Sequence, residues 1–235
     1  MLKSMRRMSL ALVTAIIGAA FALAGPIADA SPLTVVMECD PADPDAALDL
    51  PALARSSTWF VRNCFRPGPG DMTFLYGNPG DRQIMGDWNG DGVRTPGVFR
   101  GGTWYLRNSN SAGVAEISFQ FANADDIPLA GDWNGDGKDT VGVFRPSNAT
   151  FYFRNLITSG EAEATSRFGN PDDIPVVGDW NNDNVDTPGV FRSGLWYLTN
   201  RLDTGVAEGV VRFGNPTGDL PVTGDWNNDG TDTLG

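Results

Sequence analysis

A sequence repeat of 45 to 47 residues constrains the fold of this chain more than any other feature. Its most distinctive part is the segment 131–145, GDWNGDGKDTVGVFR, and close copies of it begin at Gly86, Gly178 and Gly224. A repeat of this length, rich in strand-forming residues and without a helical pattern, is typical of all-β repeat architectures. The repeat must therefore be interpreted before any single residue.

Each repeat unit contains four short segments with strand character. Aromatic and β-branched residues dominate them, and turn residues separate them. Four strands in about 46 residues is the content of one propeller blade, so the sequence predicts an all-β, β-propeller-like array of four-stranded repeats. A solenoid of stacked hairpins is the alternative. The expected strands are 58–63, 103–108, 150–155 and 195–200; 75–79, 120–124, 167–171 and 212–216; 83–85, 127–130, 174–177 and 220–223; and Gly-Val-Phe-Arg from Gly97, Gly142 and Gly189.

Both ends of the repeat region hold incomplete copies. Gly235 stands at the position of Gly97, and residues 53–55 align with residues 98–100. The two partial copies complement each other and could together form one blade that closes a four-bladed ring. A longer natural protein with further blades is the other interpretation.

The first thirty residues have the pattern of a secretory signal peptide. A basic head is followed by an apolar run over residues 10–23 and by the small-x-small sequence Ala28-Asp29-Ala30. We expect residues 1–30 to be removed, a mature chain that starts at Ser31, and a secreted, extracellular or cell-surface location without a membrane span. An uncleaved membrane anchor is the alternative, although Gly25-Pro26 ends the apolar run before a full bilayer span.

Residues 31–56 are rich in Pro, Asp and Ala, which favours an extended lead-in to a repeat domain at 57–235. Cys39 and Cys64 are the only cysteines, and a pair in an exported chain predicts a disulfide. Closing a loop of that length contributes roughly 3 kcal/mol in the chain-entropy model. Two reduced, buried thiols are the alternative.

The chain is strongly acidic. Removal of residues 1–30 takes away three basic residues and one acidic residue, which changes the formal net charge from −12 to −14. Nucleic acid and anionic membrane are therefore poor partners. Such a charge also opposes a compact state unless cations bind.

Four acidic loops predict where those cations bind. We number each loop from its first Asp: loop 1 is 87–95, loop 2 is 132–140, loop 3 is 179–187 and loop 4 is 225–233. Oxygen-bearing side chains at positions one, three and five, a main-chain carbonyl at seven and Asp at eight are hard ligands that suit Ca²⁺ better than Mg²⁺. Up to four Ca²⁺ ions are expected, and metal-free Asx turns are the alternative. The candidate ligands are Asp87, Asn89, Asp91 and Val93; Asp132, Asn134, Asp136, Lys138 and Asp139; Asp179, Asn181, Asp183, Val185 and Asp186; and Asp225, Asn227, Asp229, Thr231 and Asp232.

The four loops are not equivalent. Asn184 replaces glycine at position six of loop 3, a change that asparagine tolerates because it visits the left-handed region. Arg94 stands at position eight of loop 1, where its charge should weaken a cation site. Loop 1 is therefore predicted to bind Ca²⁺ least well.

The motif Gly-Asp-Trp-Asn-Gly-Asp-Gly-x-Asp-Thr-x-Gly-Val-Phe resembles the calcium-loop repeats of the FG-GAP and VCBS type, found in integrin α-subunit propellers and in exported bacterial proteins. The resemblance covers residues 57–235. It implies a β-propeller whose blades carry Ca²⁺ in a loop between adjacent strands, with ligands bound on other loops. One departure is that the last Asp stands at position eight rather than nine, where Thr140, Thr187 and Thr233 are found.

The residue inventory argues against catalysis. Histidine is absent, which removes Ser-His and Cys-His pairs, and only five glutamates occur. The pairs Asp125-Asp126 and Asp172-Asp173 recur at one repeat position, which favours a turn over an active site. All seven tryptophans fall at two positions of the unit, which favours packing between blades over sugar-stacking platforms.

The sequence thus predicts a secreted, calcium-binding repeat module that binds a glycan or protein surface, in an adhesive role, without catalysis of its own. An accessory propeller domain of a larger exported hydrolase is the alternative function. A structural envelope component without a soluble ligand is a third.

Overall fold

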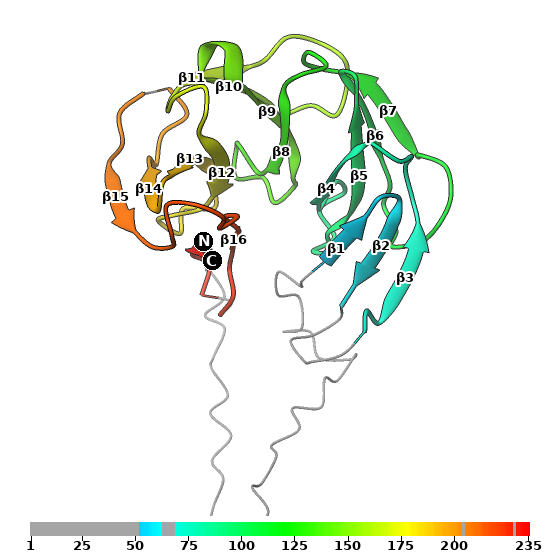
Figure 1. The fold of residues 1–235 in the computed structure, drawn as a ribbon. Helices are drawn as coiled ribbons and strands as arrows, with labels where there is room; N and C mark the ends of the chain where they lie inside the picture. Colours follow the sequence, from blue (N-terminus) through cyan, green and yellow to red (C-terminus); the bar gives the residue numbers. More distant parts are fainter. Residues whose placement is uncertain (1–51, 63–68, 204, 228) are drawn as a thin grey trace, which may run out of the picture. The chain divides into compact units, whose positions relative to one another are not determined.

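The computed structural model describes residues 52–62, 69–203, 205–227 and 229–235 (Figure 1). In these ranges the chain forms five antiparallel sheets and one short 3-10 turn, η1 (Pro146–Asn148). No helix in the described ranges has the length and apolar character needed to cross a membrane.

Three of the sheets are complete four-stranded blades. The first is β4 (Arg82–Gly86), β5 (Thr95–Arg100), β6 (Thr103–Leu106) and β7 (Ile117–Gln120); the second is β8 (Ile127–Gly131), β9 (Thr140–Arg145), β10 (Thr150–Arg154) and β11 (Ala164–Arg167); the third is β12 (Ile174–Gly178), β13 (Thr187–Arg192), β14 (Leu195–Leu198) and β15 (Gly209–Arg212). The strands of a fourth blade are divided between a three-stranded sheet, β1 (Ala52–Arg55), β2 (Thr58–Val61) and β3 (Met72–Leu75), and a two-stranded ribbon, β16 (Thr223–Gly224) and β17 (Thr233–Leu234).

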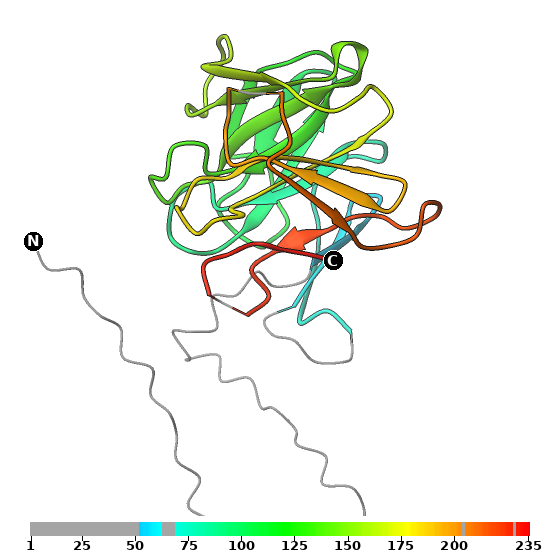
Figure 2. The same cartoon turned by 90° about the vertical axis from the view of Figure 1, so that its left-hand side faces the viewer.

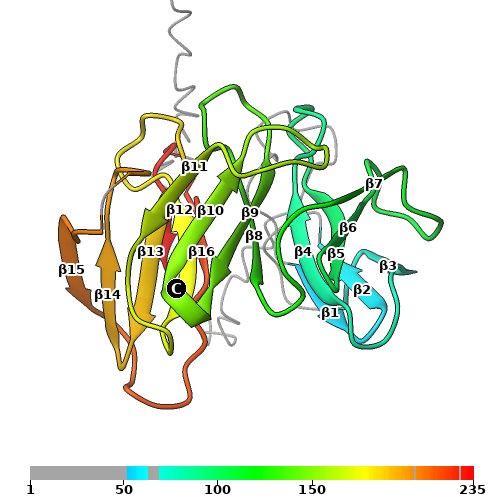
Figure 3. The same cartoon turned by 90° about the horizontal axis from the view of Figure 1, so that it is seen from above.

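The first strand of each blade lies innermost. Strand β8 contacts β4 and β12, and β12 contacts β16 (Figure 3). A narrow cavity of about 200 Å³ is lined by residues of β4, β8 and β12 and by residues 221–223, so these strands surround a common axis. Blades arranged in this way form a β-propeller, which confirms the predicted fold class, and the hairpin solenoid is not what the chain forms.

One strand of each unit lies upstream of its predicted position. The motifs at 75–79, 120–124, 167–171 and 212–216 were expected to be strands that end in turns, but β3, β7, β11 and β15 end at or before the first residue of each motif. The reason is backbone geometry. Gly77, Ala122, Gly169 and Gly214 have φ between 83° and 103°, in the left-handed range that extended strands do not use.

Successive blades share their hydrophobic cores. The valine of each Gly-Val-Phe-Arg segment packs into the blade that precedes it. Val98 joins the cluster around Trp59, Val143 joins the cluster around Trp104, and Val190 joins the cluster around Phe151. These valines are at most 1 % exposed, because the facing blade covers them completely.

Most of the tryptophans are core residues, as the repeat pattern predicted. Trp59, Trp88, Trp104, Trp133 and Trp196 are buried, whereas Trp180 and Trp226 are partly exposed. The strand tryptophans also anchor the following turn, since the Trp104 indole N–H donates to the carbonyl of Phe121 at 3.1 Å. A sugar-stacking platform needs an exposed ring face, and the five buried rings have none.

Strands β1 and β2 pair in the same register as the second and third strands of the complete blades. Leu53 pairs with Phe60 as Val98 pairs with Tyr105, which confirms the alignment of 53–55 with 98–100. Strand β1 therefore belongs to the repeat fold, although it falls within the range assigned from sequence to the lead-in. The predicted signal peptide at 1–30, most of the predicted lead-in, and the predicted disulfide between Cys39 and Cys64 lie outside the described residues.

Candidate metal centre

The four acidic loops connect the two innermost strands of each blade. Loop 2, for example, links β8 to β9, and its first carboxylate accepts hydrogen bonds from the loop backbone. Asp132 Oδ1 accepts from Gly135 N at 2.8 Å, and Asp132 Oδ2 accepts from Gly137 N at 2.7 Å. These bonds fold the loop into a tight turn around its first side chain.

Positions three, five and seven are tied together in the same way. Asn134 Nδ2 donates to Asp136 Oδ2 at 3.1 Å, and Lys138 N donates to Asp136 Oδ1 at 3.0 Å. Position six needs a left-handed backbone, which Gly137 adopts with φ 84° and Asn184 with φ 65°. The predicted tolerance for asparagine in loop 3 is thereby confirmed.

The same bonds recur in the other three loops. The position-one carboxylate accepts from the backbone N–H of position six at 2.7 to 2.8 Å, and the position-five carboxylate accepts from that of position seven at 2.9 Å. Loop 1 therefore has the same fold as its copies. The residues concerned are Asp87, Asp91, Gly92 and Val93; Asp179, Asp183, Asn184 and Val185; and Asp225, Asp229, Gly230 and Thr231.

The aspartate at position eight contacts the loop of the neighbouring blade. Asp87 N donates to Asp139 Oδ2 at 2.8 Å, and Asp139 N donates to Asp87 O at 2.9 Å. Identical two-way links join loop 2 to loop 3 and loop 3 to loop 4. Position eight was expected to complete the ligand set of its own loop, and in the structure it serves as a link between blades. The further pairs are Asp132 with Asp186 and Asp179 with Asp232.

The glycines that precede loops 2 and 3 make room for this link. A Cβ atom on Gly131 would lie 2.6 Å from Asp186 Oδ2, and one on Gly178 would lie 2.7 Å from Asp232 Oδ2. Both distances are shorter than real Cβ contacts. Gly131 and Gly178 must therefore be glycine because the next blade inserts its carboxylate there, whereas a Cβ on Gly86 would meet the ring of Trp88 at 2.6 Å.

The position-eight residues also interact electrostatically. Arg94 Nε lies 3.7 Å from Asp139 Oδ2. Burial, followed by the negative charges of Asp139 and then Asp232, raises the pKa of Asp186 to about 8, against the opposing effects of the hydrogen bond from Asp132 and the charge of Arg94. Three carboxylates and one guanidinium therefore share one region where the loops meet.

This pKa predicts a pH dependence of stability in EDTA. Because the folded-state pKa of Asp186 exceeds that of an unfolded Asp, about 3.9, the folded chain binds the extra proton between about pH 4 and pH 8. The free energy of unfolding should therefore fall as pH rises from 5 to 9. Asp186→Asn keeps a hydrogen-bond acceptor without the charge and should flatten this fall in urea titrations. An equally steep fall in the variant would contradict the assignment.

The oxygen-bearing side chains of the loops are of the type that Ca²⁺ prefers as ligands. Positions one, three and five supply two carboxylates and one amide oxygen, and these are hard ligands. No cluster of three or more Asp, Glu, His or Cys that could hold a metal ion occurs in the described part of the chain. An ion in one loop would therefore rely on the Asn oxygen and the main-chain carbonyl of position seven together with two carboxylates.

A second repeated cluster lies at the opposite end of the blades. Strand β9 begins beside loop 2 and ends at Arg145, whose guanidinium binds both oxygens of the buried Asp126 at 2.9 and 2.8 Å. The same guanidinium lies 4.2 Å from the Tyr152 ring centroid. Asn123 N also donates to Asp126 Oδ2 at 2.8 Å, so the turn predicted for the Asp-Asp pair is present.

The Asp–Arg–Tyr cluster recurs in the other two complete blades, and the sequence interpretation missed it. The available signal was the constant spacing of 19 residues between the second Asp and the Arg of Gly-Val-Phe-Arg. The equivalent residues are Asp81, Arg100 and Tyr105 in the first blade and Asp173, Arg192 and Tyr197 in the third.

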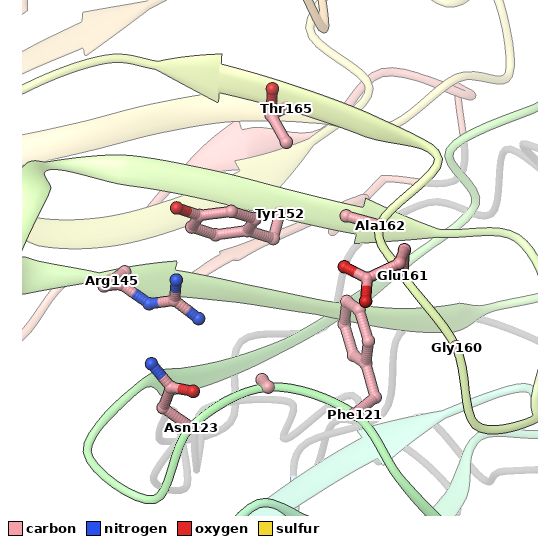
Figure 4. A pocket seen from close by; sticks show the side chains of 9 residues that line it. Phe121, Asn123, Arg145, Tyr152, Gly160, Glu161, Ala162 and Thr165 are labelled. Carbon is pink, nitrogen blue, oxygen red and sulfur yellow. The ribbon is translucent and has the colours of Figure 1, made fainter.

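A surface pocket of about 400 Å³ is lined by Arg145 and Tyr152, two members of the cluster of the second blade. Figure 4 shows Arg145 between Asn123 and Tyr152, with Phe121 and Glu161 at one side. The Arg145 guanidinium can donate to the Asn123 amide oxygen at 3.2 to 3.3 Å. The pocket thus combines an aromatic ring with charged and amide groups that can hydrogen-bond a polar ligand.

Comparison with protein-family models, with curated proteins and with solved structures finds no match for this chain.

Proposed function

We propose that the chain is a secreted, calcium-stabilised β-propeller that binds a glycan or protein surface and catalyses no reaction of its own. The observation that carries the proposal is the two-way hydrogen bonding between the loops of successive blades, as between Asp87 and Asp139. Any ion that orders a loop also orders the partner atoms of the next blade. Calcium would therefore act on the ring as a whole.

The charge of the chain supports the calcium part of the proposal. A formal charge of −12 opposes compaction, and each loop brings two carboxylates close together. In the absence of an ion the loop amides hold these carboxylates, as in the Asx turns that are the alternative interpretation. When bound, Ca²⁺ would supply positive charge and fixed oxygen coordination at the loop. The side chains of positions one, three and five would hold it.

The Asp–Arg–Tyr end of the blades is the proposed ligand-binding face. The Arg145 guanidinium is fixed by Asp126 and stacked on Tyr152, so its remaining N–H groups are preorganised for an acceptor. This face is remote from the loops, in keeping with the FG-GAP and VCBS resemblance, which implies ligand binding away from the calcium loops. Arrays of glycans and surface proteins, screened with residues 31–235 and with Tyr152→Ala, test this part. Unchanged binding by the variant would contradict it.

Isothermal titration calorimetry of residues 31–235 tests the calcium proposal directly. We expect three to four Ca²⁺ bound per chain, with Mg²⁺ much weaker. The stoichiometry should fall by one in the variant that carries Asp136→Asn, which keeps the acceptor for Lys138 N but removes one carboxylate. If the folded protein shows no heat of binding when Ca²⁺ is added, the proposal is wrong and the loops are metal-free Asx turns.

The position of Arg94 predicts that loop 1 has a lower affinity for Ca²⁺ than the other loops. Its guanidinium lies beside the Asp87–Asp139 link, so its charge should weaken Ca²⁺ binding to loop 1. Arg94→Ala should raise the affinity of loop 1 by about fivefold, the effect of roughly 1 kcal/mol of Coulomb energy near the surface. Site-resolved amide shifts of Gly92 and Gly137 measure the two loops separately. Arg167→Ala, an exposed substitution on β11, is the control.

A further inference from the structure

We propose that the pocket of the second blade binds an amino sugar residue of a glycan, and that Glu161 selects the ammonium group of this sugar. The inference rests on the proposed function and deepens it, since it names the ligand class for the same pocket. The second blade, coloured green to yellow, lies next to the first blade (Figure 2), and residues of both line the pocket.

The wall that carries Glu161 is held in place by the buried Arg154. Arg154 Nη1 donates to the Glu161 carbonyl at 2.6 Å, and Arg154 Nε donates to the Thr158 carbonyl at 2.7 Å. Gln120 N on β7 of the first blade donates to Ser159 Oγ at 3.1 Å. The loop between β10 and β11 is therefore fixed both to its own blade and to the preceding one, so this wall is ordered before a ligand binds.

The Glu161 carboxylate brings an unbalanced negative charge to the pocket. Arg145 and Asp126 neutralise each other as an ion pair, whereas the Glu161 side chain makes no hydrogen bond or ion pair with any residue that the structure describes. Figure 4 shows Glu161 across the pocket from Arg145. The chain as a whole carries a formal charge of −12 and attracts cations. An ammonium group of a ligand would donate to Glu161 in a charge-assisted hydrogen bond.

Hydrogen-bonding groups occupy the rest of the pocket. Nε and Nη2 of Arg145 bind Asp126, so Nη1 can donate to a ligand oxygen. The Tyr152 hydroxyl accepts from Asn148 Nδ2 at 2.9 Å and can donate its own proton to a ligand. Thr165 pairs with Tyr152 across the two outer strands and adds a second hydroxyl. Such groups suit the several oxygens of a sugar, whereas a lysine side chain would need apolar walls for its methylene groups.

The other two complete blades lack this combination of residues. In the repeat alignment, the position of Glu161 is taken by Val114 in the first blade and by Val206 in the third. Ala122 lines the pocket where the other repeats have glycine, and it adopts φ 83°. This conformation is strained for a residue with a Cβ, and strain of this kind is concentrated at functional sites. We therefore expect one amino sugar site per chain, in the second blade.

Isothermal titration calorimetry with a β-1,4-linked glucosamine tetramer tests the selection of an amine. We expect one tetramer bound per mature chain, residues 31–235. The N-acetylated tetramer should bind about tenfold more weakly, because acetylation removes the charge that Glu161 binds. Glu161→Gln keeps the size of the side chain without the charge and should bind both tetramers equally. Asp172→Asn, which removes an exposed charge from a turn of the third blade, is the control and should keep the preference.

Equal affinity of the unmodified chain for the two tetramers would overturn the inference. A preference that survives in Glu161→Gln would do the same, and so would tighter binding of a lysine tetrapeptide. Each of these results leaves the proposed function standing, since the chain still binds a glycan or a protein segment. A chain that binds no glycan and no surface protein on the arrays would overturn both.

Amide chemical shifts locate the bound glucosamine tetramer on the chain. Gly160, Ala162 and Thr165 line the pocket, and their signals should shift during the titration. The signals of Gly113 and Ser118, the counterparts of Gly160 and Thr165 in the first blade, should stay in place. Shifts confined to the four acidic loops would show nonspecific attraction of a polycation and would overturn the inference.

Discussion

Saturating Ca²⁺ is expected to raise the Tm of residues 31–235 by about 20 °C relative to EDTA. A ligand at 100 times its Kd stabilises the folded state by about 2.7 kcal/mol per site, and 1 kcal/mol shifts the Tm of a domain of this size by about 2 to 4 °C. Three occupied loops give the expected rise. The loops are linked across blades through Asp139, Asp186 and Asp232, so the whole unfolding transition should move rather than a local one.

The matched variant carries Asp136→Asn and Asp183→Asn. These asparagines can still accept from Lys138 N and Val185 N and lose only the exposed bond from the position-three amide, so the Tm in EDTA should fall by no more than about 4 °C. The calcium-dependent rise should shrink by more than half, because two loops each lose a carboxylate. Differential scanning calorimetry with Mg²⁺ as the control ion measures both quantities. A well-folded protein with the same Tm in EDTA and in Ca²⁺ would mean that the loops are metal-free Asx turns.

Trp104→Ala is expected to lower the Tm by about 12 °C. The Trp104 side chain is fully buried, with its ring centroid 5.1 Å from that of Phe99, and it holds the carbonyl of Phe121. Removing a buried tryptophan costs about 4 kcal/mol through lost transfer energy and a cavity. The blade core and the packing of Val143 from the next blade would weaken together.

Trp104→Phe is the control, because Phe151 occupies the equivalent position in the second blade. It should lose less than half as much stability as the alanine variant. Thermal unfolding followed by circular dichroism gives both values. A small loss of stability combined with loss of ligand binding would instead assign Trp104 to a binding platform and contradict its role in packing.

The local features of the structure could be predicted from the sequence because they depend on neighbouring residues. Aromatic and β-branched runs identified three of the four strands of each complete unit, and the Asp-x-Asn-x-Asp-Gly spacing predicted a tight turn around the first carboxylate. The left-handed backbone at Asn184 followed from residue type alone. The strand before Gly77 and its counterparts Ala122, Gly169 and Gly214 was misplaced, since the positive φ at these residues ends the strand earlier than hydrophobicity suggests.

By itself the sequence determined the repeat, its all-β blades and the acidic loops, because these depend on residue types a few positions apart. Only the tertiary structure decided that Asp139 belongs to the loop of the preceding blade and that Asp126 holds Arg145 across 19 residues. These contacts join residues that no local periodicity relates. The Asp139 contact exists because blades pack at a fixed rotation about one axis, which brings position eight of one loop against position one of the loop before it. Asp126 meets Arg145 within one blade, because β8 pairs with β9 in the register that places Ile127 opposite Phe144.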